Sequence, residues 1–156
     1  MPEARKLEIS ETLEFAAERE HVFAVLMDIA DYPRFVPGLR TSELVASDAT
    51  SVEVRYSAGI AFLEIPHTMR MTRSGPDELR FEQTSGVFRS IEGSWHLLNS
   101  TDDSSGPLTR MRYTICVERP PAAPAWAVRR AVRVFFPGML AGFRNAVHSS
   151  RPEPVA

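Results

Sequence analysis

Cysteine is almost absent from this sequence of 156 residues, in which Cys116 is the only one. No disulfide can therefore form within the chain and no cysteine-based metal site can exist, as is common in proteins of a reducing cytoplasm. The four histidines lack the spacing of metal ligands, and the chain has no Gly-x-Ser-x-Gly elbow, phosphate-binding loop or dinucleotide fingerprint. We therefore predict neither a bound metal nor a cofactor, and we expect Cys116 to be inert.

Long hydrophobic runs are also missing. The most apolar stretch, residues 132–143, is about twelve residues long and is interrupted by Pro137 and Gly138, whereas a membrane-spanning helix needs about 20 apolar residues. The first residues, MPEARKLEIS, contain no apolar segment of the kind that a signal peptide needs. These features predict a soluble, cytoplasmic protein without a membrane span.

Neither sign of charge dominates. The chain has 20 acidic and 18 basic residues, which gives a formal net charge of −2. Proteins that bind nucleic acids normally present a basic face to the phosphates, so we predict no nucleic-acid partner. Arg129, Arg130, Arg133 and Arg144 are interpreted as the solvated side of a helix, with an interaction patch as the alternative. The sequence does not predict an oligomeric state.

Alternation of apolar and polar residues, which is typical of half-buried strands, recurs along most of the chain. The strands that it predicts cover residues 6–15, 43–46, 52–57, 63–72, 79–83, 91–97 and 111–118. Helical spacing replaces it at residues 18–30, in a turn or two at 34–38, and at 125–148. Pro137 should kink the last of these helices, because proline removes a backbone hydrogen bond.

The order of these elements predicts an α+β fold in one domain. About seven antiparallel strands form a sheet, and only its concave face is large enough to bury the apolar side of the helix at 125–148. A twisted sheet curls around such a helix, and the two short helices after the first strand close one end. This arrangement encloses a space that side chains fill only in part, which predicts a ligand cavity. We expect the domain to cover residues 1–150 and the tail, 151–156, to be disordered.

Three segments carry a resemblance to a known family. They are EHVFAVLMDIADYPRFVPGL at 20–39, VEVRY at 52–56 and SGVFRSIEGSW at 85–95. With the closing helix, they resemble the polyketide cyclase/dehydrase and coenzyme-Q-binding branch of the START-like, Bet v 1-like superfamily. The resemblance extends over nearly the whole chain. It implies the helix-grip fold and the binding of a hydrophobic or amphipathic small molecule.

His67 is the first candidate for chemistry. Its position in an alternating strand places it with apolar residues that point inward. A neutral imidazole in an apolar pocket can act as a general acid or base. The alternative is a histidine of the core whose ring is satisfied by a backbone group or a tyrosine.

Four polar residues also occupy inward-pointing positions of the alternating pattern: Tyr56, Gln83, Arg89 and Tyr113. They are candidates for orienting a ligand, or they are buried polar groups that find partners within the protein. A bulge near Gly86 would reverse the direction of Arg89. The apolar candidates for the lining of the cavity are Met69, Phe81, Trp95, Phe135, Met139 and Phe143.

Two positions depart from what the resemblance implies for catalysis. The aromatic polyketide cyclases that the chain resembles carry an inward arginine on the strand that contains His67 and a tyrosine just after the short helices. Met69 and Leu39 occupy these places here. We therefore favour the binding or carriage of a lipid-like, quinone-like or polyketide-like molecule. The alternatives are a cyclase or dehydratase that uses His67 and cavity tyrosines, and a ribosome- or protein-interaction module.

Overall fold

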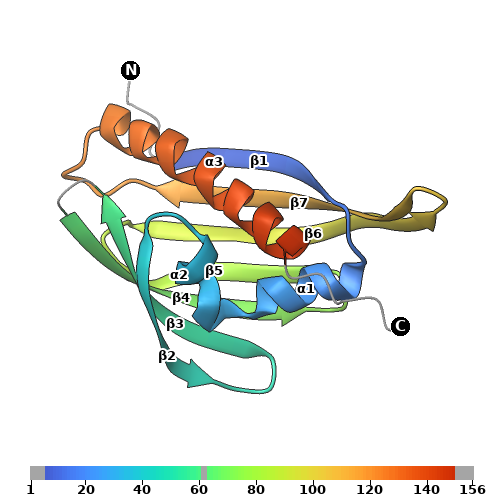
Figure 1. Cartoon of the computed structure of the whole chain (residues 1–156). Helices are drawn as coiled ribbons and strands as arrows, with labels where there is room; N and C mark the ends of the chain where they lie inside the picture. The colour runs from blue at the N-terminus through green and yellow to red at the C-terminus, as the bar shows by residue number, and fades with distance from the viewer. Residues whose placement is uncertain (1–5, 61–62, 150–156) are drawn as a thin grey trace.

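The computed structural model describes residues 6–60 and 63–149 (Figure 1). Its seven strands form one antiparallel sheet in the order β1-β7-β6-β5-β4-β3-β2, so that every neighbouring pair except β1 and β7 is consecutive in the chain. The strands are β1 (Lys6–Phe15), β2 (Leu39–Ser47), β3 (Ser51–Ile60), β4 (Leu63–Ser74), β5 (Glu78–Gly86), β6 (Ser90–Asp103) and β7 (Gly106–Glu118).

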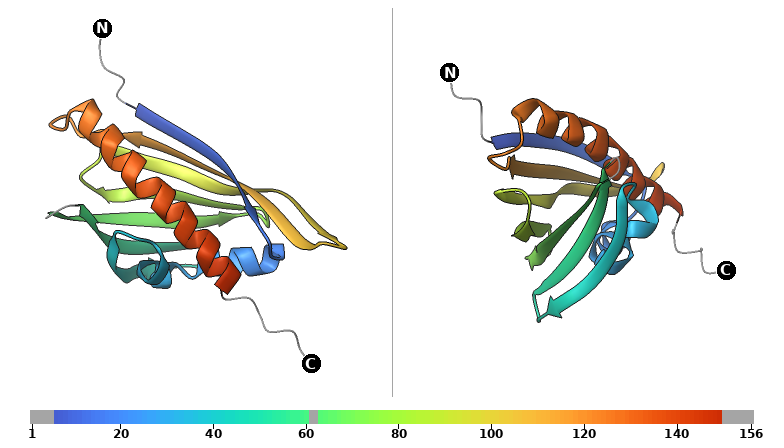
Figure 2. Two further views of the ribbon diagram at one scale, coloured as in Figure 1. Left: turned by 45° about the horizontal axis from the view of Figure 1, so that its top comes forward. Right: turned by 90° about the vertical axis from the view of Figure 1, so that its left-hand side faces the viewer.

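The helices lie on one side of this sheet. After β1 come α1 (Arg19–Met27), the short 3-10 helix η1 (Ile29–Asp31) and α2 (Tyr32–Phe35), and the chain continues to α3 (Ala125–Ser149) after β7. Figure 2 shows the sheet curving around α3, with α1 beside the C-terminal end of that helix. This is the predicted helix-grip arrangement, and the α+β prediction is confirmed.

The core lies between α3 and the concave face of the sheet. Alternate residues of the strands point into it because side chains of a strand alternate between its two faces. The buried apolar members of this set on β3 to β7 are Val54, Tyr56, Ala58, Met69, Met71, Leu79, Phe81, Trp95, Leu97, Met111, Tyr113, Ile115 and Val117. From α3, the side chains of Val128, Val132, Met139, Phe143 and Val147 meet them.

The C-terminal half of α3 packs closely against the short helices. A Cβ atom at Gly142 would lie only 2.0 Å from the carbonyl oxygen of Phe35, so glycine permits this approach of α2. The ring of Phe143 lies 4.9 Å from that of Tyr32, and the Tyr32 hydroxyl donates a hydrogen bond to the carbonyl oxygen of Leu26. These contacts fix α1 and α2 at one end of the sheet.

Two histidines join the end of α3 to the N-terminal region. Nε2 of His148 accepts a hydrogen bond from the backbone N–H of Ala16 at 3.1 Å. Nε2 of His21 lies 2.8 Å from the carbonyl oxygen of Val147 and donates to it. We call these two contacts the histidine clasp.

Some boundaries differ from the predicted ones. β2 is longer than the predicted 43–46 because it pairs with β3 from Leu39 to Ser47, although as an edge strand it buries too little to show alternation. α1 ends at Met27, and η1 takes up the rest of the predicted helix. α3 continues through Pro137 as one helix. The predicted disordered tail lies outside the described residues. Among the described helices, none is both long enough and apolar enough to cross a membrane.

Candidate functional site

A pocket of about 170 Å³ lies between α3 and the concave face of the sheet. We call it the central pocket. Its walls come from β2 to β7, from α2 and from the middle of α3. The residues that line it are Tyr32, Val36, Leu39, Tyr56, Ala58, Ile65, His67, Met69, Met71, Leu79, Phe81, Phe88, Ile91, Trp95, Tyr113, Ile115, Val117, Ala131, Val132, Phe135, Phe136, Met139 and Phe143.

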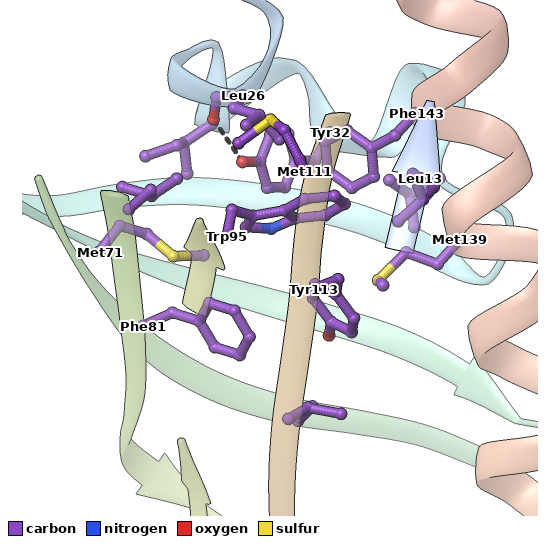
Figure 3. Close-up of a cluster of buried hydrophobic side chains, with 14 of the residues drawn as sticks. Leu13, Leu26, Tyr32, Met71, Phe81, Trp95, Met111, Tyr113, Met139 and Phe143 are labelled. Atoms are coloured by element: carbon purple, nitrogen blue, oxygen red, sulfur yellow. Dashed lines mark hydrogen bonds between the residues drawn. The ribbon is translucent and has the colours of Figure 1, made fainter. Parts of the chain in front are cut away.

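Most of the residues that the sequence singled out meet at this pocket. In Figure 3, the side chains of Phe81, Trp95 and Tyr113 on the sheet face those of Met139 and Phe143 on α3. The Trp95 ring lies 4.6 Å from Tyr113 and 5.0 Å from Phe143. The other predicted residues in the lining are Tyr56, His67, Met69 and Phe135.

Arg89 does not point into the pocket, so the predicted inward direction is wrong. The residue lies in the bend between β5 and β6, and its side chain is exposed. Its backbone N–H donates to the carbonyl oxygen of Glu118 at 3.1 Å, which holds the bend against the end of β7. The alternation of side chains along β5 does not predict the direction of Arg89, because β5 ends at Gly86, three residues earlier.

Gln83 also lies outside the lining. Its Nε2 donates to the carbonyl oxygen of Phe88 at 2.7 Å, so the amide ties β5 to the bend that follows it. Its Oε1 is buried and has no hydrogen-bond partner among the described residues. The side chain thus supports Phe88, which is a pocket residue, and does not face the pocket itself.

The polar groups of the lining differ in whether they have a partner. The hydroxyl of Tyr56 donates to the carbonyl oxygen of Ile29 at 3.3 Å. Within the part of the chain that the structure describes, the Tyr113 hydroxyl and the Trp95 indole N–H have no hydrogen-bond partner. These two donors are available to an acceptor atom of a ligand.

His67 lines the pocket beside Tyr56. The two rings are 5.6 Å apart, and Nδ1 of His67 lies 3.4 Å from the carbonyl oxygen of Ile65, which is a long contact. Burial lowers the pKa of His67, and the Ile65 carbonyl opposes this effect only in part. The imidazole is therefore neutral at pH 7, and with Nδ1 donating to the Ile65 carbonyl its Nε2 is available as an acceptor.

The pocket as a whole carries no charge at neutral pH. Its described lining contains no Asp, Glu, Lys or Arg, and the His67 imidazole is neutral. Burial raises the pKa of Tyr56 and raises those of Tyr32 and Tyr113 strongly, so all three hydroxyls keep their protons. In residues 6–60 and 63–149, no three His, Cys, Asp or Glu side chains come together in a way that could hold a metal ion.

Several residues of the lining were not predicted. Tyr32 lies between the predicted helices at 18–30 and 34–38, and Phe88 lies in a bend, so the alternation of a strand gives no direction for either side chain. Phe136 follows Phe135 on α3, and both side chains line the pocket, with their ring centroids 5.5 Å apart. Leu39 and Met69 both line the pocket, so the two departures from the cyclases give it apolar surface.

Comparison of the sequence with protein families identifies one that matches residues 15–144 and is described as "Polyketide cyclase / dehydrase and lipid transport". The match covers the chain from the end of β1 to the C-terminal half of α3, and thus every residue of the central pocket. No curated protein matches the chain in sequence.

Solved structures with the same fold are numerous. A protein from Thermus thermophilus superposes with a TM-score of 0.79 at 18% identity, over 94% of this chain and 100% of the other. A START superfamily protein from Mycobacterium smegmatis has a TM-score of 0.78 at 15% identity, over 92% and 99%. An aromatase/cyclase from Streptomyces sp. R1128 has a TM-score of 0.76 at 17% identity, over 92% of each chain. At these identities the likeness concerns the fold.

Proposed function

Because the chain belongs to the polyketide cyclase / dehydrase and lipid transport family, we propose that it binds or carries a small hydrophobic molecule in the central pocket. The molecule is lipid-like, quinone-like or polyketide-like. The observation that carries this proposal is the pocket wall, which is almost entirely apolar and has no charged side chain among the described residues. Burial of apolar surface then supplies most of the binding free energy.

The electrostatics of the pocket favour a neutral ligand. A carboxylate taken from water into an apolar site loses its hydration, and no described cation lines the pocket to compensate it. A neutral ligand with one acceptor atom can instead take a hydrogen bond from the Tyr113 hydroxyl or the Trp95 N–H. The tyrosine, tryptophan and phenylalanine rings of the lining offer stacking surface to a flat ligand.

The size of the pocket limits what enters without a rearrangement. Its 170 Å³ is below the roughly 300–1,000 Å³ that is typical of ligand sites. An apolar cavity of about 150 Å³ admits a single benzene ring. Met69, Met71 and Met139 line the walls, and the flexible thioether chain can shift to admit a larger molecule.

Native mass spectrometry of the purified protein tests the proposal, with a co-purifying hydrophobic mass as the expected result. Titration with 2-naphthol and 2-naphthoate then tests the charge preference, because the two share a ring system and differ in charge. In a Trp126→Phe background the remaining Trp95 reports occupancy by its fluorescence. We expect saturable quenching by the naphthol and at least about tenfold weaker binding of the naphthoate.

A pocket-filling variant distinguishes the pocket from other sites. Ala131→Phe places a ring in the pocket, whereas Ala141→Phe adds the same ring on the exposed side of α3. We expect only the first to abolish binding, with both variants folded by circular dichroism. Equal binding by the two variants would mean that the central pocket is not the site.

A second candidate function is catalysis, and the position of His67 supports it. The neutral imidazole lies beside Tyr56 in the lining, and the hydroxyl of Tyr113 is unpartnered among the described residues. Such a set can move a proton during a cyclisation or dehydration of a ketide-like substrate. His67→Ala should then abolish turnover of such a substrate and retain binding of 2-naphthol. Unchanged turnover in the variant would exclude this mechanism.

A further inference from the structure

The outer side of α3 carries exposed apolar side chains next to arginines, an arrangement that the fold does not require. Figure 2 shows that, within residues 6–60 and 63–149, no other element covers this side of the helix. Trp126 is 66% exposed and Val134 is 74% exposed, although both are residues that a solvated helix face usually lacks. We call the surface formed by Trp126, Arg129, Arg130, Arg133 and Val134 the outer basic face.

The helical repeat places these residues together. Arg130 and Arg133 follow Trp126 by four and seven positions, so all three lie in one line along the helix. Val134 stands eight positions after Trp126, on the flank of this line. An apolar ring and an apolar branched side chain are thus interleaved with guanidinium groups on two to three turns of α3.

The charge of this face is unbalanced. α3 contains four of the chain's 18 lysines and arginines and none of its 20 acidic residues. Among the described residues, Arg129, Arg130, Arg133 and Arg144 form no ion pair. On the convex face of the sheet, in contrast, Arg55, Arg70 and Arg110 lie 3.6, 3.5 and 3.1 Å from glutamates. The arginines of α3 therefore lack the partners that these three arginines of the sheet have.

We propose that the outer basic face docks on the surface of an anionic lipid bilayer. Arginine side chains are attracted to anionic headgroups, and tryptophan is favoured at the boundary between headgroups and acyl chains. The exposed apolar residues Trp126 and Val134 favour this partner over RNA, because the arginines alone would be enough to bind RNA phosphates. The bilayer would lie against the helix as a surface contact, since α3 is not apolar enough to span it.

The same turns of α3 also form a wall of the central pocket. Ala131, Val132 and Phe135 line the pocket from the opposite side of the helix. The bend between β5 and β6, whose Phe88 also lines the pocket, presents Val87, which is 55% exposed, and Arg89, which is also exposed. Docking by this face would hold one pocket wall against the membrane, whatever molecule the pocket binds. The proposal therefore does not depend on the ligand.

Co-sedimentation of the full chain with vesicles at low salt tests the proposal. We expect binding to vesicles of phosphatidylcholine with phosphatidylglycerol, little binding to phosphatidylcholine alone, and loss of binding as salt is raised. Each arginine near an anionic surface contributes roughly fivefold in affinity, so R129Q/R130Q/R133Q should weaken binding by about a hundredfold. R55Q/R70Q/R110Q removes the same charge from the convex face and should have little effect.

Fluorescence separates insertion of Trp126 from attraction of charge alone. On anionic vesicles we expect quenching of Trp126 by brominated lipid, and W126F should lose this signal while Trp95 stays unquenched. Binding that is equally weakened by both arginine triplets, or that leaves Trp126 unquenched, would overturn the proposal. So would binding of single-stranded RNA in place of vesicles. Circular dichroism and unchanged binding of 2-naphthol would show that the variants remain folded.

Discussion

The two halves of α3 differ in how they are held. Residues 137–149 are fixed by the contact of Gly142 with α2, by the ring of Phe143 and by the histidine clasp. Residues 125–136 bury only Val128 and Val132, and on their inner side they border the central pocket. One helix thus combines an anchored half with a half that leaves space beside it. Of the six α3 residues that line the central pocket, four lie in the N-terminal half: Ala131, Val132, Phe135 and Phe136.

Replacement of Phe143 should give the largest loss of stability. Its ring lies 5.2 Å from Phe35 and 5.0 Å from Trp95, and Phe143→Ala would remove these contacts and leave a cavity. We expect a loss of about 3–5 kcal/mol in the free energy of unfolding. Phe135→Ala, in the other half, should cost less than half as much because Phe135 is only half-buried. Urea denaturation measures both. Equal costs would contradict the contrast between the halves.

The two glycines of α3 provide a second test. A Cβ atom at Gly142 would collide with the Phe35 carbonyl oxygen at 2.0 Å, so Gly142→Ala should destabilise the protein by about 1–3 kcal/mol. At Gly138 the nearest atom would be Pro37 Cγ at 3.8 Å, an ordinary contact. Gly138→Ala should therefore stabilise the helix by up to about 1 kcal/mol. Thermal unfolding of the two variants should shift in opposite directions, and a rise in the unfolding temperature of Gly142→Ala would show that α2 shifts to admit the methyl group.

The histidine clasp should contribute less. His148→Ala removes the acceptor of the Ala16 N–H and should cost about 1 kcal/mol. Hydrogen exchange of the Ala16 amide should become faster in this variant, while amides of β6 keep their protection. Unchanged exchange at Ala16 would show that the contact does not hold the end of α3.

The smallest expected effect concerns pH. Burial in the folded protein lowers the pKa of His67 below its usual value of 6.5. At pH values between the lowered pKa and 6.5, the unfolded chain therefore binds more protons than the folded one. The free energy of unfolding should therefore decrease as pH falls below about 6.5. His67→Leu removes this contribution and should flatten the dependence over that range. Urea midpoints measured at several pH values test this, and an unchanged slope would show that His67 is not buried as described.

Much of the pocket follows from strand parity. Tyr56, Met69, Phe81, Trp95 and Tyr113 all lie within regular strands, where alternate side chains share a face, and all line the pocket. Arg89 lies in a bend, where no such rule applies. The alternation of a strand also does not predict where the end of a long side chain lies. It therefore did not show that the Gln83 amide donates a hydrogen bond to the Phe88 carbonyl oxygen.

The size of the pocket could not be predicted in the same way. It depends on how rings from different elements pack, as where Tyr32 and Tyr56 stack at 6.1 Å and Phe81 and Tyr113 at 5.7 Å. Such packing joins residues far apart in the chain. Composition shows only that the interior is apolar, and not how much of it remains unfilled.

The strand order has a consequence for the sequence of folding events. β2 to β7 pair with their neighbours in the chain, whereas β1 must find β7 about a hundred residues away. Because short loop closures are fast, we expect the five consecutive hairpins to form before β1 and α3 are in place. The central pocket would then come into existence only in the last step. Pulse-labelling hydrogen exchange should detect protected amides in β3 to β6 before those of β1, and the reverse order would exclude this route.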